Sequence, residues 1–332
     1  MQVPAARAVP EPSATARPPR ATATKVVRTV RGDISPSDLG PTDAHEHLFL
    51  VTPIQPGDEF SDVGRAIEEA GTLVAAGVKA LVDWTPIGLG RDPEGLLRVS
   101  AATGLHVVAA TGVHRDAHYP ADDPLRAATA ESLADRFVAD LTGEGVRSGM
   151  VKAGASYHRL QAFEQKIFAA AAEAHHRTGA PICVHTEHGT MGLGIVERLS
   201  HLGVPATSVL LAHLDRNPDP VEHAETGATG AWLQLDGPGR TKYWPDSTVL
   251  QLIADLAEHG LAGQILLGGD TGRSSMMRAY GGGPGLDYLF ARFKPRLERE
   301  LGEELSRTIF VENPARAFAF EPLHAAASFS RS

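Results

Sequence analysis

Residues 43–50 read Asp-Ala-His-Glu-His-Leu-Phe-Leu, so two histidines one residue apart stand at the head of an apolar run. An apolar run of this length predicts a buried β-strand. Side chains at positions i and i+2 of a strand project from the same face, which predicts that His45 and His47 point together and that Glu46 points away. Two aligned imidazoles provide half of a metal site, since neutral imidazole is a common metal ligand.

Seven further strand-like runs follow, and helical patterns lie between them. The eight runs occupy residues 41–48, 78–86, 105–114, 148–156, 181–187, 209–215, 230–237 and 264–271. Apolar residues recur at helical spacing in the stretches Ser61–Ala76, Asp92–Thr103, Leu125–Leu141, Arg159–Thr178 and Asp246–Glu258. This alternation of strands and helices predicts βαβ units and a parallel sheet.

The number of repeats predicts the architecture. Eight repeats over about 250 residues favour an α/β fold of the (β/α)8 or TIM barrel type. An open doubly wound sheet is the second choice, but no Gly-rich phosphate turn follows the first run. Before the barrel, residues 26–42 predict a short N-terminal hairpin, with Gly32 and Asp33 at its turn, that could cap the barrel floor. We expect one domain, residues 25–322, between a disordered tail at residues 1–24 and a C-terminal tail at residues 323–332.

Composition excludes several classes of function. The chain of 332 residues has a formal net charge of −9, which argues against a nucleic-acid surface. No apolar run approaches the ~20 residues that a membrane helix needs, and the first 24 residues lack the apolar segment of a secretory signal. Cys183 is the single cysteine. An intrachain disulfide and a cysteine-based zinc cluster are therefore excluded, and we expect a cytoplasmic protein.

Chemistry in such a barrel is located at the C-terminal ends of the strands. Six residues of metal-binding or metal-bridging type occupy these ends or the strands that lead to them: His45, His47, Lys152, His185, His213 and Asp270. A single histidine at a strand end is more often an ordinary core or rim residue. The whole set, which includes a lysine and an aspartate that are rarely buried without a partner, indicates a metal site.

Lys152 requires its own explanation, because an ammonium group with a free pKa near ~10.4 would repel divalent cations. The deprotonated amine can instead add carbon dioxide and become a carbamate, whose two oxygens could bridge two metal ions. The neighbours Met150, Val151 and Ala153 argue against a lysine on the surface. We therefore expect Lys152 to lie inside the barrel.

The ordered set His-x-His, Lys, His, His and Asp resembles that of the phosphotriesterase family in the amidohydrolase superfamily. The resemblance runs from about residue 26 to residue 320 and includes the segments SDLGPTDAHEHL, VVAATGVH, VKAGAS, VHTEHGT, LAHLDRNPD, GGDTGR and YGGGPGLDYL. It implies a hydrolase with two divalent metal ions, usually zinc, that share a nucleophilic hydroxide. The implied ligands are His45, His47 and Asp270 for the more buried ion, His185 and His213 for the more exposed one, and carbamylated Lys152 between the two.

The same resemblance implies roles in proton transfer. Asp270 would accept a proton from the hydroxide and pass it toward the leaving group. Asp215 stands two residues after His213. It is placed either to orient a ligand or relay a proton, or to cap a helix.

The loops after the seventh and eighth runs bear on the substrate, since the family includes phosphotriesterases, lactonases and amide hydrolases. Arg240, Lys242 and Tyr243 follow the seventh run, and Arg273 follows the eighth. Basic side chains on adjacent loops predict an anionic substrate, bound by Lys242, Tyr243 and Arg273. The region resembles the branch that hydrolyses phosphorylated sugar lactones, although Met276 stands where that branch has a tyrosine. The anion could therefore be a phosphate or a carboxylate.

The leading hypothesis is a zinc-dependent lactonase that acts on an anionic sugar lactone. An aryldialkylphosphatase-type phosphotriesterase and an N-acyl amide hydrolase are alternatives that would use the same two metal ions. An inactive barrel that serves as a binding module is a third alternative, which the presence of all six ligand positions disfavours. We expect a small-molecule substrate as the partner and, because family members are often dimers, a homodimer.

Overall fold

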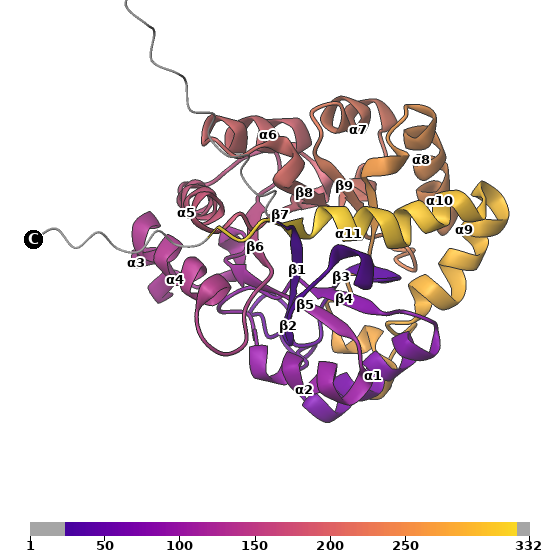
Figure 1. Cartoon of the computed structure of the whole chain (residues 1–332), viewed down its shortest axis with the longest axis horizontal. Coiled ribbons are helices and arrows are strands. Elements are labelled where there is room, and N and C mark those ends of the chain that lie inside the picture. Colours follow the sequence, from indigo (N-terminus) through magenta and orange to yellow (C-terminus); the bar gives the residue numbers. More distant parts are fainter. Residues whose placement is uncertain (1–23, 324–332) are drawn as a thin grey trace, which may run out of the picture.

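Eight parallel strands lie at the centre of the computed structural model, which describes residues 24–323 (Figure 1). Each strand is hydrogen-bonded to the next one along the chain. The strands are β3 (Thr42–Glu46), β4 (Ala80–Asp83), β5 (His106–Gly112), β6 (Met150–Ala155), β7 (Ile182–Thr186), β8 (Val209–Ala212), β9 (Trp232–Leu235) and β10 (Ile265–Leu267). All eight predicted strand runs are confirmed. Residues 1–23 and 324–332, which make up almost all of the two expected tails, lie outside the described residues.

The last strand returns to the first and closes the barrel. The Asp270 amide donates a hydrogen bond of 2.8 Å to the His45 carbonyl oxygen. A β-carbon on Gly268 would lie 2.5 Å from the β-carbon of His45, a contact that real side chains do not make. Glycine therefore allows β10 to approach β3 this closely. The predicted (β/α)8 barrel is confirmed, and the open sheet is excluded.

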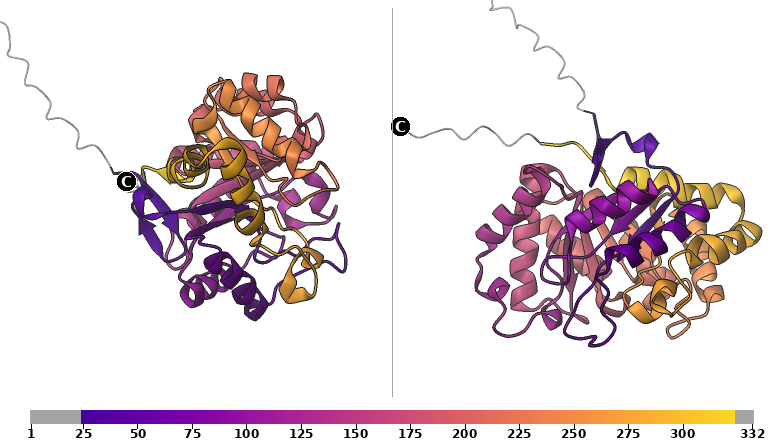
Figure 2. Two further views of the ribbon diagram at one scale, coloured as in Figure 1. Left: turned by 90° about the vertical axis from the view of Figure 1, so that its right-hand side faces the viewer. Right: turned by 90° about the horizontal axis from the view of Figure 1, so that it is seen from below.

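Helices cover the outside of the barrel (Figures 1 and 2). They are α1 (Val63–Ala75), α2 (Pro93–Thr103), α3 (Pro124–Ala127), α4 (Ala130–Thr142), α5 (Ala162–Thr178), α6 (Gly192–His201), α7 (Pro220–Gly227), α8 (Asp246–Glu258), α9 (Lys294–Leu301), α10 (Glu303–Arg307) and α11 (Asn313–Ala317). No helix among residues 24–323 is both long enough and apolar enough to span a membrane.

One of the five predicted helical stretches is wrong. The segment Leu125–Leu141 is not a single helix, because it is divided between α3 and α4. Ala128 has an extended backbone, with φ −63° and ψ 142°. Thr129 then begins α4, since its side chain accepts a hydrogen bond from the Ser132 amide. Threonine is a favourable residue at this capping position, so the break is encoded locally.

Three short strands form a small antiparallel sheet: β1 (Val26–Thr29), β2 (Gly32–Ile34) and β11 (Ala319–Phe320). The predicted hairpin is present, but its turn lies at residues 30–31, and Gly32 and Asp33 belong to β2. This register places the Asp33 carboxylate against the Arg28 guanidinium, with contacts of 2.7 and 2.8 Å. The Val30 amide donates to the Val107 carbonyl near the start of β5. The sheet therefore lies at the barrel floor, as Figure 2 also shows.

The two-residue period of the strands places polar residues inside the barrel, above an apolar layer. On β6, Met150 packs in the interior core, and Lys152 lies two residues further along the same face. On β7, His185 follows Cys183 in the same way. Polar side chains thus converge at the C-terminal ends of the strands, where barrel enzymes have their active sites.

Candidate metal centre

His45 and His47 project toward the same carboxylate, in agreement with their predicted spacing. Their Nε2 atoms lie 3.5 and 3.4 Å from Asp270 Oδ1, and their ring centres are 5.5 Å apart. Asp270 follows β10 and has a φ of 46°, which non-glycine residues rarely adopt. Strained residues of this kind are concentrated at functional sites.

Hydrogen bonds determine which nitrogen each of these histidines offers. His45 Nδ1 donates to Asp236 Oδ2 over 3.1 Å. The Thr85 hydroxyl donates to a backbone carbonyl, so its oxygen accepts from His47 Nδ1 at 2.8 Å. Both Nε2 atoms therefore keep their lone pairs, and these face Asp270. Metal-binding histidines are oriented in this way, with the second nitrogen donating to a carboxylate or another oxygen.

Asp236 follows β9, and we did not predict a role for it. Its Oδ2 atom accepts hydrogen bonds from His45 Nδ1 and from the His213 amide, which is 3.0 Å away. Burial, together with the negative charge of Asp270, raises the pKa of Asp236 to about 7. Its position directly after a strand was the available signal, because site residues of barrels occur there.

The set of donor atoms suits a divalent cation. His45 Nε2 and His213 Nδ1 are buried and make no hydrogen bond of good geometry among residues 24–323, although His213 Nδ1 lies 3.0 Å from Asp236 Oδ2. Three ligand atoms lie within 4.8 Å of one another, one each from His45, His213 and Asp270. Buried polar atoms without partners are rare, and imidazole nitrogens suit zinc and similar transition metals. The cluster can therefore hold a metal ion.

Lys152 lies beside this cluster and is 2% exposed. Its Nζ atom is 4.2 Å from the centre of the Trp84 ring, which also stacks on His45 at 3.9 Å. Burial lowers the pKa of Lys152 to about 8. At neutral pH, more of such an amine is unprotonated than at its ordinary pKa, and carbamate formation requires that neutral form.

His185 is held by a carboxylate of its own. Its Nε2 atom donates to Glu187 Oε2 over 2.7 Å, which leaves the lone pair on Nδ1. The rings of His185 and His213 are 4.6 Å apart, so the two predicted ligands are brought together. Burial would raise the pKa of Glu187, but the His185 hydrogen bond and the Arg115 charge hold it at about 2. We did not predict Glu187, although it belongs to the quoted segment VHTEHGT.

Two arginines contact the other oxygen of Asp270. Arg216 and Arg240 place terminal nitrogens 2.9 and 2.8 Å from Asp270 Oδ2. Burial alone would raise the pKa of Asp270, but the positive charge of Arg240 is the main influence that holds it well below its ordinary value. Asp270 is therefore ionised at neutral pH. Arg240, which we grouped with the basic residues of the substrate loops, is engaged with this carboxylate.

Asp215 supports the site from behind Asp236. Its Oδ1 atom accepts a hydrogen bond of 2.7 Å from the Asp236 amide. Burial raises the pKa of Asp215 to about 6. The residue that caps the following helix, α7, is Asp219. Of its two predicted roles, the position of Asp215 fits support of the site better than helix capping.

The three predicted substrate residues line the same cavity as the candidate ligands. This cavity has a volume of about 190 Å³, and its walls include Lys242, Tyr243, Arg273 and Met276. Lys242 Nζ lies 4.7 Å from the centre of the Tyr243 ring. Arg273 is paired with Asp58 at 2.8 Å, so part of its charge is already neutralised.

Two histidines that we did not select also line this cavity. His114 follows β5, and its ring centre lies 4.2 Å from that of His118 and 4.5 Å from that of His185. The available signal was the end of the third strand-like run, which closes on His114. A single histidine at a strand end carries too little information to be selected without the structure.

Known proteins are similar to this chain in sequence and fold over most of its length. The model of the phosphotriesterase family matches residues 25–318. A phospho-furanose lactonase from Mycoplasmopsis synoviae (strain 53) is 32% identical over 90% of this chain and 92% of its own length. A phosphotriesterase homology protein from Escherichia coli (strain K12) is 30% identical over 84% of this chain and 98% of its own length. The crystal structure of a lactonase from Listeria monocytogenes covers 89% of this chain and 99% of its own, with 32% identity and a TM-score of 0.85. The chain therefore belongs to the phosphotriesterase family.

Proposed function

We propose that this chain is a metal-dependent lactonase that opens an anionic sugar lactone. The observation that carries the proposal is the convergence of two imidazole lone pairs on ionised Asp270, beside buried Lys152. Two of the three similar proteins described above are lactonases, which favours a lactone over a phosphotriester or an amide.

We propose that the centre holds two divalent ions, both zinc, which the possible metal cluster of His45, His213 and Asp270 supports. The proposed ligands are His45, His47 and Asp270 for one ion, His185 and His213 for the other, and Lys152 as a bridging carbamate. When bound, such ions supply activated water at neutral pH and withdraw electron density from the carbonyl group under attack.

Asp270 is the proposed proton acceptor. Arg216 and Arg240 hold its Oδ2 atom. Its Oδ1 atom faces the imidazoles of His45 and His47. Because its pKa is well below the ordinary value, Asp270 is ionised at neutral pH, which is the state that a proton acceptor must have. The carboxylate takes the proton from the attacking water and delivers it to the ring oxygen that leaves when the lactone opens.

Lys242 and Arg273 are proposed to hold the anionic group of the substrate, on loops beside the metal centre. Both line the cavity that contains the candidate ligands. The Arg273 side chain is 40% exposed although it is paired with Asp58, so it can still contact a ligand. Bidentate contacts from arginine suit both phosphate and carboxylate groups.

A substrate screen with metal analysis tests the proposal. Purified protein loaded with zinc is assayed against neutral lactones, phosphorylated lactones, N-acyl amides and aryl phosphotriesters. We expect close to two divalent ions per chain and the highest kcat/KM on an anionic lactone. His45→Ala and His185→Ala should lower metal content and activity together. Full activity without bound divalent ions, or a preference for phosphotriesters or amides, would contradict the proposal.

A further inference from the structure

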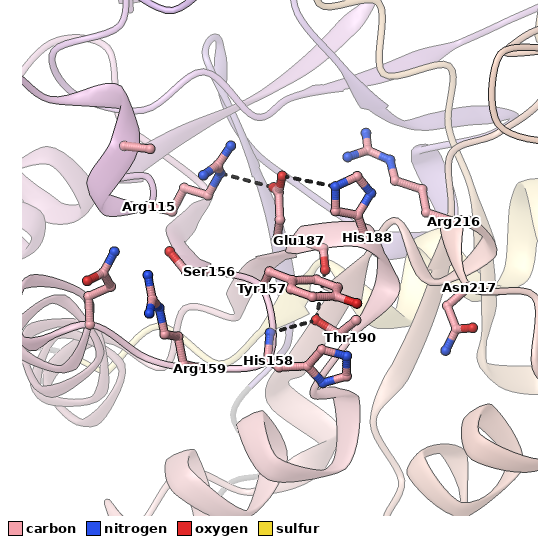
Figure 3. A pocket seen from close by; sticks show the side chains of 12 residues that line it. Arg115, Ser156, Tyr157, His158, Arg159, Glu187, His188, Thr190, Arg216 and Asn217 are labelled. Carbon is pink, nitrogen blue, oxygen red and sulfur yellow. Dashed lines mark hydrogen bonds and ion pairs between the residues drawn. The ribbon is translucent and has the colours of Figure 1, made fainter.

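A second cavity opens beside the candidate metal centre, over the loops that follow β5 to β8 (Figure 3). Its volume is about 960 Å³. Arg115 comes from the loop after β5, Tyr157 and Arg159 from the loop after β6, His188 from the loop after β7, and Asn217 from the loop after β8. We call this cavity the β5–β8 groove.

The groove carries positive charge although the chain as a whole is acidic. Arg115, Arg159 and Arg216 line it, and Glu187 is the acidic residue among its lining residues. Glu187 is already engaged, by Arg115 Nε at 3.0 Å and by His185 Nε2 at 2.7 Å. The side chain of Arg159 makes no hydrogen bond or ion pair within residues 24–323, and in Figure 3 it extends along the cavity wall. A guanidinium without a protein partner in a concave site indicates an anionic ligand.

The groove is continuous with the candidate metal centre. Arg115, Glu187 and Arg216 line both cavities. Arg216 contacts Asp270 on one side, and Glu187 holds the predicted ligand His185 on the other. A substrate whose reacting bond lies at Asp270 can therefore extend past these side chains into the groove.

The position of the groove in the barrel distinguishes it from the loops that carry Lys242 and Arg273. In the order of the strands, β5 lies four places from β9, and β6 lies four places from β10. Strands four places apart in an eight-stranded barrel face each other across its axis. Arg115 and Arg159 are therefore opposite Lys242 and Arg273, with the candidate metal centre between the two basic clusters.

Four of the five non-glycine residues with positive φ in the described part of the chain lie in the groove or at the candidate metal centre. Among residues 24–323, the non-glycine residues with positive φ are His158, His188, Met191, His213 and Asp270. The first two line the groove, and the last two belong to the candidate metal centre. The Thr190 hydroxyl accepts a hydrogen bond of 3.1 Å from the His158 amide and so joins two of the groove loops. Because strain is concentrated at functional sites, this observation supports a ligand role independently of the charge.

We propose that the β5–β8 groove is a second anion subsite, in which Arg159 and Arg115 hold a carboxylate or phosphate at one end of the substrate. The opposite end is the one that Lys242 and Arg273 hold, so the substrate carries an anionic group at each end. This inference rests on the proposed function and adds to it the chemistry of the substrate. Tyr157, which also lines the groove and is 57% exposed, has a ring surface against which the body of a substrate can pack.

Binding measurements on the full-length, zinc-loaded protein test the subsite without any need for catalysis. The probes are fructose 6-phosphate, fructose 1,6-bisphosphate and 6-phosphogluconate, titrated by calorimetry. The variants are Arg159→Gln, Arg273→Gln and, as a matched control, Arg299→Gln on α9, whose side chain is 68% exposed and does not line the groove. Arg159 is exposed and has no partner among the described residues, so its replacement should leave folding unchanged.

The expected result is that the bisphosphate binds more tightly than the monophosphate and that Arg159→Gln removes this advantage. The loss should be about 5- to 10-fold, between the value of an exposed ion pair and that of a buried charged hydrogen bond. Arg273→Gln should weaken both sugar phosphates, and Arg299→Gln neither. A similar loss with 6-phosphogluconate would show that a carboxylate can take one of the two positions.

Two outcomes would overturn the subsite. One is unchanged affinity for every probe in Arg159→Gln, and the other is an equal loss for the monophosphate and the bisphosphate. The result of the lactone screen does not depend on the result of these binding measurements. A protein that hydrolyses no lactone but shows the selective loss in Arg159→Gln would retain the groove as an anion subsite and refute the lactonase proposal.

Discussion

Replacement of Lys152 by methionine should stabilise the metal-free protein at neutral pH, although it should abolish activity. The Lys152 side chain is 2% exposed, and burial lowers its pKa from 10.5 to about 8. At ~1.4 kcal/mol per pKa unit, a charged Lys152 costs the folded state roughly 3 kcal/mol. The contact with the Trp84 ring offsets about 0.5–2 kcal/mol of this. Methionine keeps the apolar stem without the charge, so Lys152→Met should raise the free energy of unfolding by roughly 1–3 kcal/mol.

The pH dependence separates this effect from a change in packing. Between pH 8 and 10.5 the unfolded chain binds more protons at this lysine than the folded chain does, so stability rises with pH. Below about pH 8 the full cost is present, and above pH 10.5 it is lost. The difference between wild type and Lys152→Met should therefore be constant near neutral pH and disappear toward pH 10.5.

Urea unfolding of chelator-treated protein, followed by tryptophan fluorescence from pH 7 to 10, measures this difference. Lys79→Met, on the exposed surface, is the matched control and should change little. With zinc and bicarbonate present the order should reverse, because the wild type alone can form the carbamate. Equal or lower stability of Lys152→Met at pH 7 in the metal-free state, with the same pH slope as the wild type, would refute the reasoning.

Four further predictions concern the centre and the barrel closure. Asp270→Asn should lower kcat by ~10²–10⁴; a small change with metal content retained would assign the proton transfer to another group. Asp236→Asn should weaken metal binding ~10–100-fold in chelator competition, because it orients His45 and His213; unchanged affinity would leave Asp236 a purely structural role. Gly268→Ala should lower the free energy of unfolding by ~1–3 kcal/mol, since its β-carbon would meet that of His45; an unchanged urea midpoint would contradict the account of barrel closure. Chelation should lower the midpoint of wild-type unfolding and zinc should restore it, whereas an unchanged midpoint would argue against a bound ion.

The barrel could be predicted because its strands are short, apolar and regularly spaced along the chain. The same regularity predicted that His45 and His47 share a face and that Lys152 lies inside. The hairpin turn was predicted incorrectly because Gly32 and Asp33 form a strong local turn signal. The ion pair between Asp33 and Arg28 competes with that signal. It favours a register in which Gly32 and Asp33 belong to β2 and face Thr29 and Arg28 of β1. Local propensity is overridden here by a cross-strand contact.

The sequence signals for Asp236 and Glu187 were too weak to select them, because the importance of each residue depends on a partner from another loop or strand. Asp236 bonds His45 across 191 positions of the chain, and one carboxylate among 40 acidic residues carries no periodic signal. Glu187 is close to His185 in sequence, but its second partner, Arg115, comes from a different loop. The β5–β8 groove could not be predicted from the sequence for the same reason, since it is formed by four loops that become neighbours only when the barrel forms.

At neutral pH the metal-free centre contains two buried charges of opposite sign, and each of them destabilises the folded state. Burial and the charge of Asp270 raise the pKa of Asp236 to about 7, so its contribution to stability is greatest at low pH and is lost as the pH rises through about 7. The cost at Lys152 begins to fall only as the pH rises through about 8. Near pH 7–8, therefore, the buried carboxylate and the buried ammonium are both unfavourable. A divalent cation would stabilise the ionised carboxylates, and carbamylation would replace the ammonium by an anion that this cation can bind. The same residues that lower the stability of the metal-free protein would thus favour metal binding. This would hold at neutral pH, where the centre is proposed to act.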